Sequence, residues 1–295
     1  MNPKKNLTIS LLTAGAFVML GAANIALANH SWGNYHWSRA ANPFTLRVVD
    51  SMTSAWDAYL TEAKNDWSAS SVLDLSAETG SIANNQRRQC KPVAGKIRAC
   101  NYAYGSNGWL GLAQIWVSGN HITQGTAKVN DTYFNTSTYN TPAWRRLVMC
   151  QEIAHDFGLD HQDEDFSNPN LGSCMDYTSD PDGPPSNEHP NQHDYDQLET
   201  IYAHLDGSAQ TNVPWWQGLF GQRPALAALP EATLDREIIG EWREDAQEWR
   251  DEAHAWGKEM RRDARNRTSL YVRELNKNEK VFTFVIWVDP PAEAH

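Results

Sequence analysis

The chain has 295 residues, of which 41% are hydrophobic and 11% are aromatic. This composition excludes a largely disordered chain, and the length suffices for one domain of catalytic size with an appended segment. The formal net charge of -11 at pH 7 opposes a general attraction to nucleic acid or anionic lipid. We therefore expect no nucleic-acid partner.

Residues 1–28 have the pattern of a secretory signal peptide. Lys4 and Lys5 precede an uncharged apolar run that ends in Ala26-Leu27-Ala28, a small-x-small cleavage site. Cleavage after Ala28 would remove both lysines and change the formal charge from -11 to -13. An uncleaved membrane anchor is the alternative, because the run is about twenty residues long. We expect a secreted protein, extracellular or periplasmic, without stable membrane insertion after cleavage.

Export changes how the four cysteines are interpreted. An even number of cysteines in an oxidising compartment favours disulfides over free thiols. Four cysteines allow three pairings, and proximity in the sequence favours Cys90 with Cys100 and Cys150 with Cys174.

Residues 29–207 alternate between strand and helix patterns, which predicts one α/β (α+β) domain. Runs rich in β-formers predict strands at 44–50, 71–78, 96–105, 111–119 and 122–130. The spacing of apolar residues predicts helices at 54–69, 141–157 and 194–205. Thr141 and Pro142 are typical of the start of the second helix, and Gly158 is typical of its end. Asp, Asn, Pro and Gly predominate at 162–192, which predicts a long loop.

After residue 207 the composition changes, and a linker at 208–230 leads to a predicted C-terminal module at 231–295. Steps of three and four predict a helix with an apolar seam made of Ile239, Trp242, Ala246, Trp249, Ala253, Trp256 and Met260. The seam either packs on the rest of the protein or self-associates as a coiled coil. Two β-rich runs at 269–275 and 280–288 predict a β-hairpin.

The stretch CQEIAHDFGLDH at 150–161 carries the strongest chemical signal. Glu152, His155, Gly158 and His161 have the spacing E-x-x-H-x-x-G-x-x-H. A helix places groups one turn apart on one face, and the glycine permits a sharp turn that returns a third group toward them. Four specified residues at fixed offsets arise by chance in about one chain in a thousand. The pattern therefore predicts a metal site.

A second motif, Ser173-Cys174-Met175-Asp176-Tyr177, resembles the Met-turn beneath the zinc of metzincins. With both motifs, residues 44–207 resemble a metzincin-type zinc metallopeptidase domain. The helix and third-ligand spacing are similar to those of matrixins, whereas S-x-M-x-Y is similar to the form in astacins and serralysins. The resemblance implies a mixed sheet, an active-site helix and a Met-turn.

The resemblance also implies a role for each matching residue. His155 and His161 would bind Zn²⁺, and Glu152 would be the general base for metal-activated water in peptide-bond hydrolysis. Met175 would form a hydrophobic floor, and Tyr177 would contact the metal or the oxyanion. The substrate would be a protein or peptide bound in extended form along an edge strand.

The chain departs from the family at Gln151, which stands where the first His ligand is expected. A glutamine Oε1 can bind a cation, but a neutral carbonyl is a weaker zinc ligand than an imidazole nitrogen. In one interpretation, Gln151 or a water completes the site of a working endopeptidase. In another, the metal is weak or absent and the domain is a pseudo-peptidase that binds protein. In a third, a thiolate of Cys150 or Cys174 replaces the missing imidazole.

Overall fold

The computed structural model describes residues 30–206 and 255–289. The predicted signal peptide, the linker and most of the apolar seam lie outside these residues, so those interpretations and the domain boundaries stay predictions. None of the helices within the described ranges has the length and apolarity that a membrane span requires.

One mixed sheet of nine strands runs through the described residues. Its order is β3-β2-β4-β6-β5-β9-β8-β7, and β1 pairs with β6 outside this path. The strands are β1 His36–Trp37, β2 Phe44–Ser51, β3 Leu73–Thr79, β4 Ile97–Tyr102, β5 Trp109–Ser118, β6 His121–Asn130, β7 Lys258–Arg262, β8 Thr268–Glu274 and β9 Glu279–Trp287. Pairing from β3 to β6 is parallel, and pairing from β6 through β5 to β7 is antiparallel.

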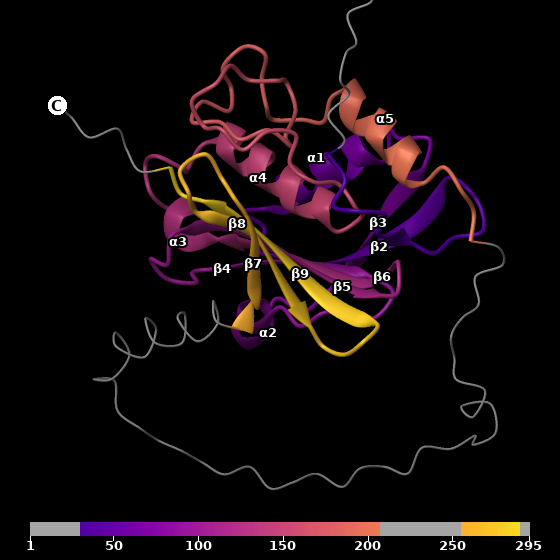
Figure 1. Cartoon of the computed structure of the whole chain (residues 1–295). Helices are drawn as coiled ribbons and strands as arrows, with labels where there is room; N and C mark the ends of the chain where they lie inside the picture. The colour runs from indigo at the N-terminus through magenta and orange to yellow at the C-terminus, as the bar shows by residue number, and fades with distance from the viewer. Residues whose placement is uncertain (1–29, 207–254, 290–295) are drawn as a thin grey trace, which may run out of the picture.

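The helices are α1 Asp57–Trp67, α2 Asn84–Gln89, α3 Asp131–Phe134, α4 Pro142–His155 and α5 Gln192–Ile201. Figure 1 shows α1, α4 and α5 together on one side of the sheet. Their apolar faces and the sheet enclose the main core, in which Trp67 and Leu147 are fully buried. The prediction of a mixed α/β fold is confirmed.

Helix α4 begins and ends as its sequence predicts. The Thr141 side chain accepts a hydrogen bond from the Trp144 backbone N–H at 3.3 Å, and Pro142 occupies the first helical position. Gly158 follows the helix with a φ of +110°, and a Cβ there would lie 2.7 Å from the Tyr35 carbonyl oxygen. Only glycine meets both conditions, so the turn after the helix requires it.

The prediction of the apolar seam is wrong at its C-terminal end. Met260 lies in strand β7 and its side chain is exposed, whereas a single helix was expected to continue to this residue. The helical conformation stops before Gly257, which has a φ of +100° and lies against the backbone of β8. Strand pairing therefore overrides the helical spacing at this end of the seam.

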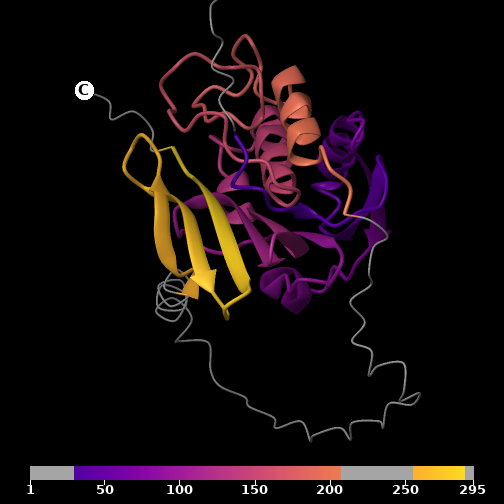
Figure 2. The ribbon, with the colours of Figure 1, turned by 45° about the vertical axis from the view of Figure 1, so that its right-hand side comes forward.

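The predicted C-terminal hairpin is confirmed as β8 and β9, and it belongs to the same sheet as the rest of the protein. Strand β9 pairs antiparallel with β5 from Trp109 opposite Trp287 to Ser118 opposite Glu279. Within the sheet formed by residues 30–206, β5 would otherwise be the edge strand. Figure 2 shows the three C-terminal strands, in yellow and orange, continuing the sheet beyond that edge.

Candidate metal and active site

The structure brings His155 and His161 together. His155 is the last residue of α4, and His161 follows the Gly158 turn; their Nε2 atoms are 2.9 Å apart. Both side chains are buried. The predicted convergence of the two imidazoles is therefore present in the fold.

The other ring nitrogens define the protonation of the pair. His155 Nδ1 donates to the Leu159 carbonyl oxygen at 2.8 Å, and His161 Nδ1 lies 2.5 Å from Glu164 Oε1. Because these partners are acceptors, each neutral ring carries its proton on Nδ1 and directs a lone pair from Nε2. Burial lowers the pKa of His155 well below its usual value and that of His161 to about 3. Two lone pairs at this separation repel each other unless a cation lies between them.

Gln151 and Glu152 add further polar groups without partners. Both side chains are buried, and neither amide atom of Gln151 nor Oε2 of Glu152 has a hydrogen-bond partner among the described residues. Burial, followed by the charge of Asp156, raises the pKa of Glu152 well above its usual value. Unpaired buried amides and carboxyls are costly, so this group fits a site that holds a cation and water.

The segment from Ser173 to Tyr177 is attached to the loop that carries His161. Gln162 N donates to the Met175 carbonyl oxygen at 2.6 Å, and Tyr177 N donates to the Asp163 carbonyl oxygen at 3.2 Å. Met175 is fully buried in the main core. The segment is therefore held against the loop that carries His161.

The predicted disulfides Cys90–Cys100 and Cys150–Cys174 are both present. The second joins α4, at the residue before Gln151, to the residue before Met175. Because both sulfurs are bonded, the interpretation in which a thiolate of Cys150 or Cys174 replaces the missing imidazole is wrong for this structure.

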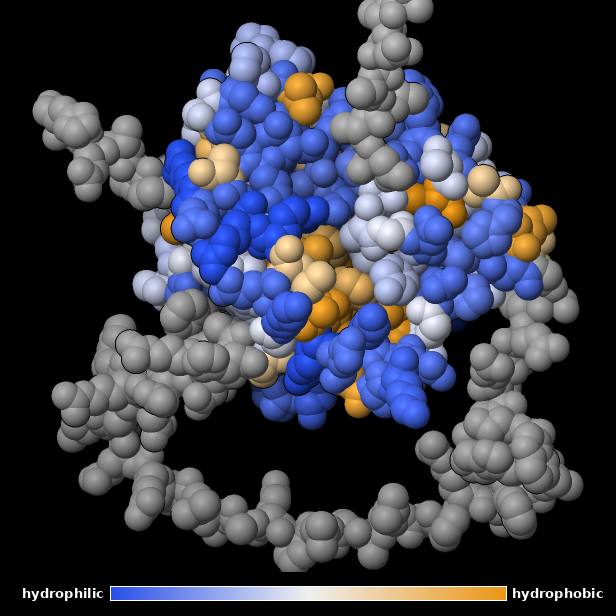
Figure 3. Space-filling view, viewed as in Figure 1, coloured by the Kyte–Doolittle hydropathy of each residue, from blue (hydrophilic) through white to orange (hydrophobic). Residues whose placement is uncertain are grey.

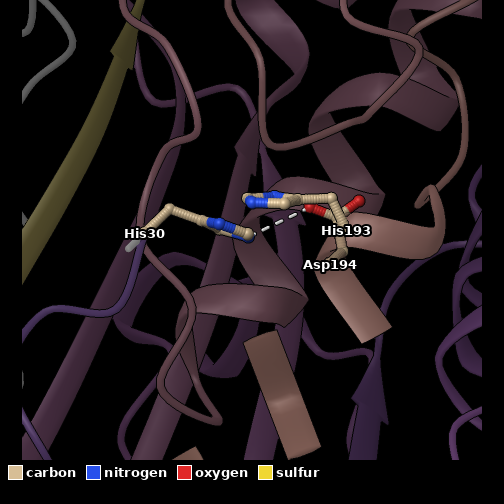
Figure 4. A group of neighbouring side chains, drawn as sticks. All are labelled: His30, His193 and Asp194. Atoms are coloured by element: carbon tan, nitrogen blue, oxygen red, sulfur yellow. Dashed lines mark ion pairs between the residues drawn. The ribbon is translucent and has the colours of Figure 1, made fainter. Parts of the chain in front are cut away.

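A buried histidine near the predicted cleavage point, His30, lies against His193 and Asp194 of α5 (Figure 4). Asp194 Oδ2 accepts hydrogen bonds from Ser173 Oγ and from the Asn191 backbone N–H, both at 2.7 Å. Its Oδ1 lies 3.1 Å from His30 Nε2, and the His30 ring stacks on His193. The start of the described chain is thus fastened to α5 and, through Asp194, to the Ser173–Tyr177 segment.

Strand β9 covers the candidate site. The Phe284 ring stacks on the His155 imidazole with centroids 4.2 Å apart, and the Tyr177 hydroxyl donates to the Val285 carbonyl oxygen at 3.1 Å. Figure 3 shows apolar surface near the centre of the viewed face, close to where Figure 1 places β9. In this conformation the protein's own strand lies where an extended peptide beside β5 would lie.

Ion pairs hold the C-terminal strands against the His161 loop. Arg261 in β7 forms a bidentate pair with Asp160, at 2.6 and 2.5 Å, and lies 2.8 Å from Glu164. Ser269 in β8 donates to the other Glu164 oxygen at 2.8 Å. Glu164 therefore orients His161 and anchors two C-terminal strands. Sequence reasoning missed Arg261 and Phe284, because no local pattern connects them to the motif. Glu164 belongs to an acidic run, Asp160, Asp163, Glu164 and Asp165, that has no recognised ligand spacing and was predicted to be a solvated loop, whereas the structure pairs it with His161.

Comparison with known proteins does not identify the chain. No protein-family model and no curated protein matches it. Among solved structures it is similar to high choriolytic enzyme 1, a hatching enzyme zinc-protease from Oryzias latipes (medaka fish), at 11% sequence identity and a TM-score of 0.33. The match covers 57% of this chain and 94% of that one. A likeness this weak establishes no shared activity.

Proposed function

We propose that the protein is a secreted zinc-dependent endopeptidase that its own C-terminal strands keep closed. The observation that carries the proposal is the opposed pair of Nε2 atoms of His155 and His161, 2.9 Å apart, with both Nδ1 atoms already hydrogen-bonded. Two neutral imidazoles in this arrangement form a ligand pair for a cation that prefers nitrogen, such as zinc.

The remaining groups suit hydrolysis of a peptide bond. His155, His161 and the amide oxygen of Gln151 would hold the zinc, which would supply an activated water and polarise the scissile carbonyl. Glu152 would accept the proton from that water and pass it to the leaving amine, and its raised pKa makes its carboxylate a stronger base than an exposed one. The Tyr177 hydroxyl, which donates to a carbonyl oxygen in the closed form, would donate to the developing oxyanion.

The pairing of strand β9 supports the proposal that the substrate is an extended peptide. Strand β9 runs antiparallel to β5, and the carbonyl oxygen of Val285 in β9 accepts a hydrogen bond from the Tyr177 hydroxyl. Backbone pairing of this kind recognises a peptide main chain with modest dependence on its sequence. A substrate that follows the same path has to displace β9, so cleavage is expected only from molecules in which β9 has opened.

A pseudo-peptidase is the second candidate, and two observations favour it. Gln151 offers a weaker zinc ligand than histidine, and Phe284 already packs on the face of His155. In that case the same scaffold would bind protein without cleaving it.

Elemental analysis of the purified protein and a casein proteolysis assay distinguish the two candidates. The variants are Glu152→Ala, Gln151→His and, as a control, Glu199→Ala, which changes an exposed glutamate of α5. Proteolysis by the wild type that only Glu152→Ala abolishes supports the peptidase. No proteolysis by the wild type, with one more equivalent of zinc in Gln151→His than in the wild type, would support the pseudo-peptidase instead.

A further inference from the structure

Three histidines outside the motif surround one carboxylate oxygen. The Nε2 atoms of His36, His121 and His204 lie 3.2, 3.2 and 3.4 Å from Oδ1 of Asp206. The rings of His121 and His204 each stand edge-on to that of His36. His36 is buried, whereas the side chains of His121 and His204 are 42% and 59% exposed, so the group can be reached from solvent.

The fold assembles this group from three distant parts of the sequence. Parallel pairing of β1 with β6 places His36 directly beside His121. The chain that follows α5 is held there because the Tyr202 hydroxyl accepts from Trp37 N at 3.2 Å and donates to the Phe157 carbonyl oxygen at 2.9 Å. This attachment brings His204 and Asp206 to the end of β1.

Asp206 is oriented with one oxygen toward the histidines. Its Oδ2 accepts from the Arg39 backbone N–H at 3.1 Å and lies 3.5 Å from the Arg39 guanidinium. Its backbone N–H donates to the Arg39 carbonyl oxygen at 3.0 Å, which fixes the residue from the other side. Oδ1 is therefore left for the three imidazoles.

The polarity of the group calls for a cation. His36 Nδ1 lies 2.6 Å from the Asn34 carbonyl oxygen and must donate to it, which leaves a lone pair on Nε2 of the neutral ring. That lone pair faces a carboxylate oxygen at 3.2 Å, which is repulsive without a positive charge between them. A carbonyl that fixes the tautomer of a histidine in this way is the usual support of a metal-ligating ring.

We propose that His36, His121 and Asp206 bind a second zinc ion, separate from the His155–His161 site. Their ligand atoms all lie within 4.8 Å of one another. In a tetrahedral site with zinc–ligand bonds of about 2.0–2.1 Å, neighbouring ligand atoms lie about 3.3 Å apart. The 3.2 Å distances from Nε2 of His36 and of His121 to Asp206 Oδ1 agree with this edge length. Calcium and magnesium prefer oxygen ligands, so two imidazoles favour zinc. The three ligands tie β1, the start of β6 and the chain after α5 together, and His204 lies beside them, 3.4 Å from the same Asp206 oxygen.

The test measures zinc retained after dialysis by the wild type and by the double variant His121→Ala/His204→Ala. Zinc in the His155–His161 site contributes equally to both proteins, so the difference reports only the second site. The matched control is His189→Ala, which removes a 44% exposed histidine that pairs with Asp66. We expect the double variant to lose one equivalent of zinc and the control to lose none. Equal zinc contents in all three proteins, including none in each, would overturn the proposal.

A second readout keeps the test independent of how well the double variant folds. In His121→Ala, which alters one ring that is 42% exposed, we expect zinc affinity at the second site to fall by at least about tenfold. Added zinc at about a hundred times its Kd should raise the Tm of the wild type by about 5–10 °C, and by less in His121→Ala. Identical zinc-dependent shifts in the two proteins would show that His121 is not a ligand and would contradict the three-residue site.

Discussion

Gln151 shows how one side chain separates the two candidate functions. Its amide is fully buried, and none of its hydrogen-bonding positions is used by the described residues. Leaving a buried amide unpaired costs about 1–3 kcal/mol, a large part of the stability of a typical domain. An apolar side chain of similar size would avoid this cost, so an amide at this position is best explained by a ligand that it contacts.

Gly111 in β5 makes room for the Glu152 carboxyl group. A Cβ at this position would overlap Glu152 Oε1 and would lie 2.7 Å from Val148 Cγ1. We expect Gly111→Ala to lower the free energy of unfolding by about 1–3 kcal/mol and to reduce proteolysis strongly, because the carboxyl group has to move. Zinc content should be unchanged, since the atoms nearest to the added Cβ belong to Glu152 and Val148 and not to either imidazole.

A double-mutant cycle with Glu152→Ala checks the cause of this effect. If the overlap with the carboxyl group is responsible, Gly111→Ala should cost measurably less in urea unfolding of the Glu152→Ala protein than in the wild type. The same cost in both backgrounds would assign the effect to Val148 or to the strand itself.

At the scale of elements, the pairing of β9 with β5 decides whether the site is open. An unpaired edge strand offers backbone groups to any extended chain, and the protein's own hairpin takes this position first. The ion pairs of Arg261 with the His161 loop hold the hairpin from the other side. Opening of the site therefore requires that the pairing of β9 with β5 and the ion pairs of Arg261 are broken together.

A disulfide across the two strands would test this closure. Ser118 and Glu279 are exposed and opposite each other, and the hydrogen bond from Gly119 N to the Asn278 carbonyl oxygen makes theirs the closer, non-hydrogen-bonded pair. In Ser118→Cys/Glu279→Cys we expect proteolysis to be lost on oxidation and restored by mild reduction, while Ser118→Cys alone remains active in both conditions. Full activity of the oxidised double variant would show that β9 does not block the substrate path.

Sequence patterns predicted the local features of this fold and missed those that depend on distant pairing. Helix α4, its cap and the Gly158 turn follow from residues within a few positions of one another, so they could be located. The hairpin β8–β9 was also predicted. Its pairing with β5 was not, because β5 lies more than a hundred residues earlier and no local signal indicates which strand the hairpin joins. Strand β7 was mistaken for helix because its spacing continues a helical period.

The candidate site divides in the same way. His155, His161, Glu152 and Gln151 share one short stretch, so their joint spacing predicted a metal site. The cover over that site could not be predicted, because Phe284 and Val285 are ordinary core residues of a strand until β9 pairs with β5. His36, His121 and His204 are scattered along the chain, and single histidines in a sequence carry no such signal.

At the scale of the whole molecule, the disulfide Cys150–Cys174 links the two halves of the candidate site covalently. It joins α4 to the Ser173–Tyr177 segment over a sequence separation of 24, whereas Cys90–Cys100 spans 10 and joins the end of α2 to β4. In the loop-entropy account a bond of the first kind stabilises a protein by about 3 kcal/mol, and the shorter loop contributes somewhat less.

Replacing each pair by alanines tests this link. We expect Cys150→Ala/Cys174→Ala to lose about 3 kcal/mol in urea unfolding, to exceed the loss in Cys90→Ala/Cys100→Ala, and to bind zinc more weakly at the His155–His161 site, because the residues beside the bond are Gln151 and Met175. The wild type should show no reactive thiol after unfolding without reductant. Equal losses of stability with unchanged zinc affinity in both variants would mean that the Cys150–Cys174 bond stabilises the chain without shaping the site. Free thiols in the unfolded wild type would show that the bond is not formed.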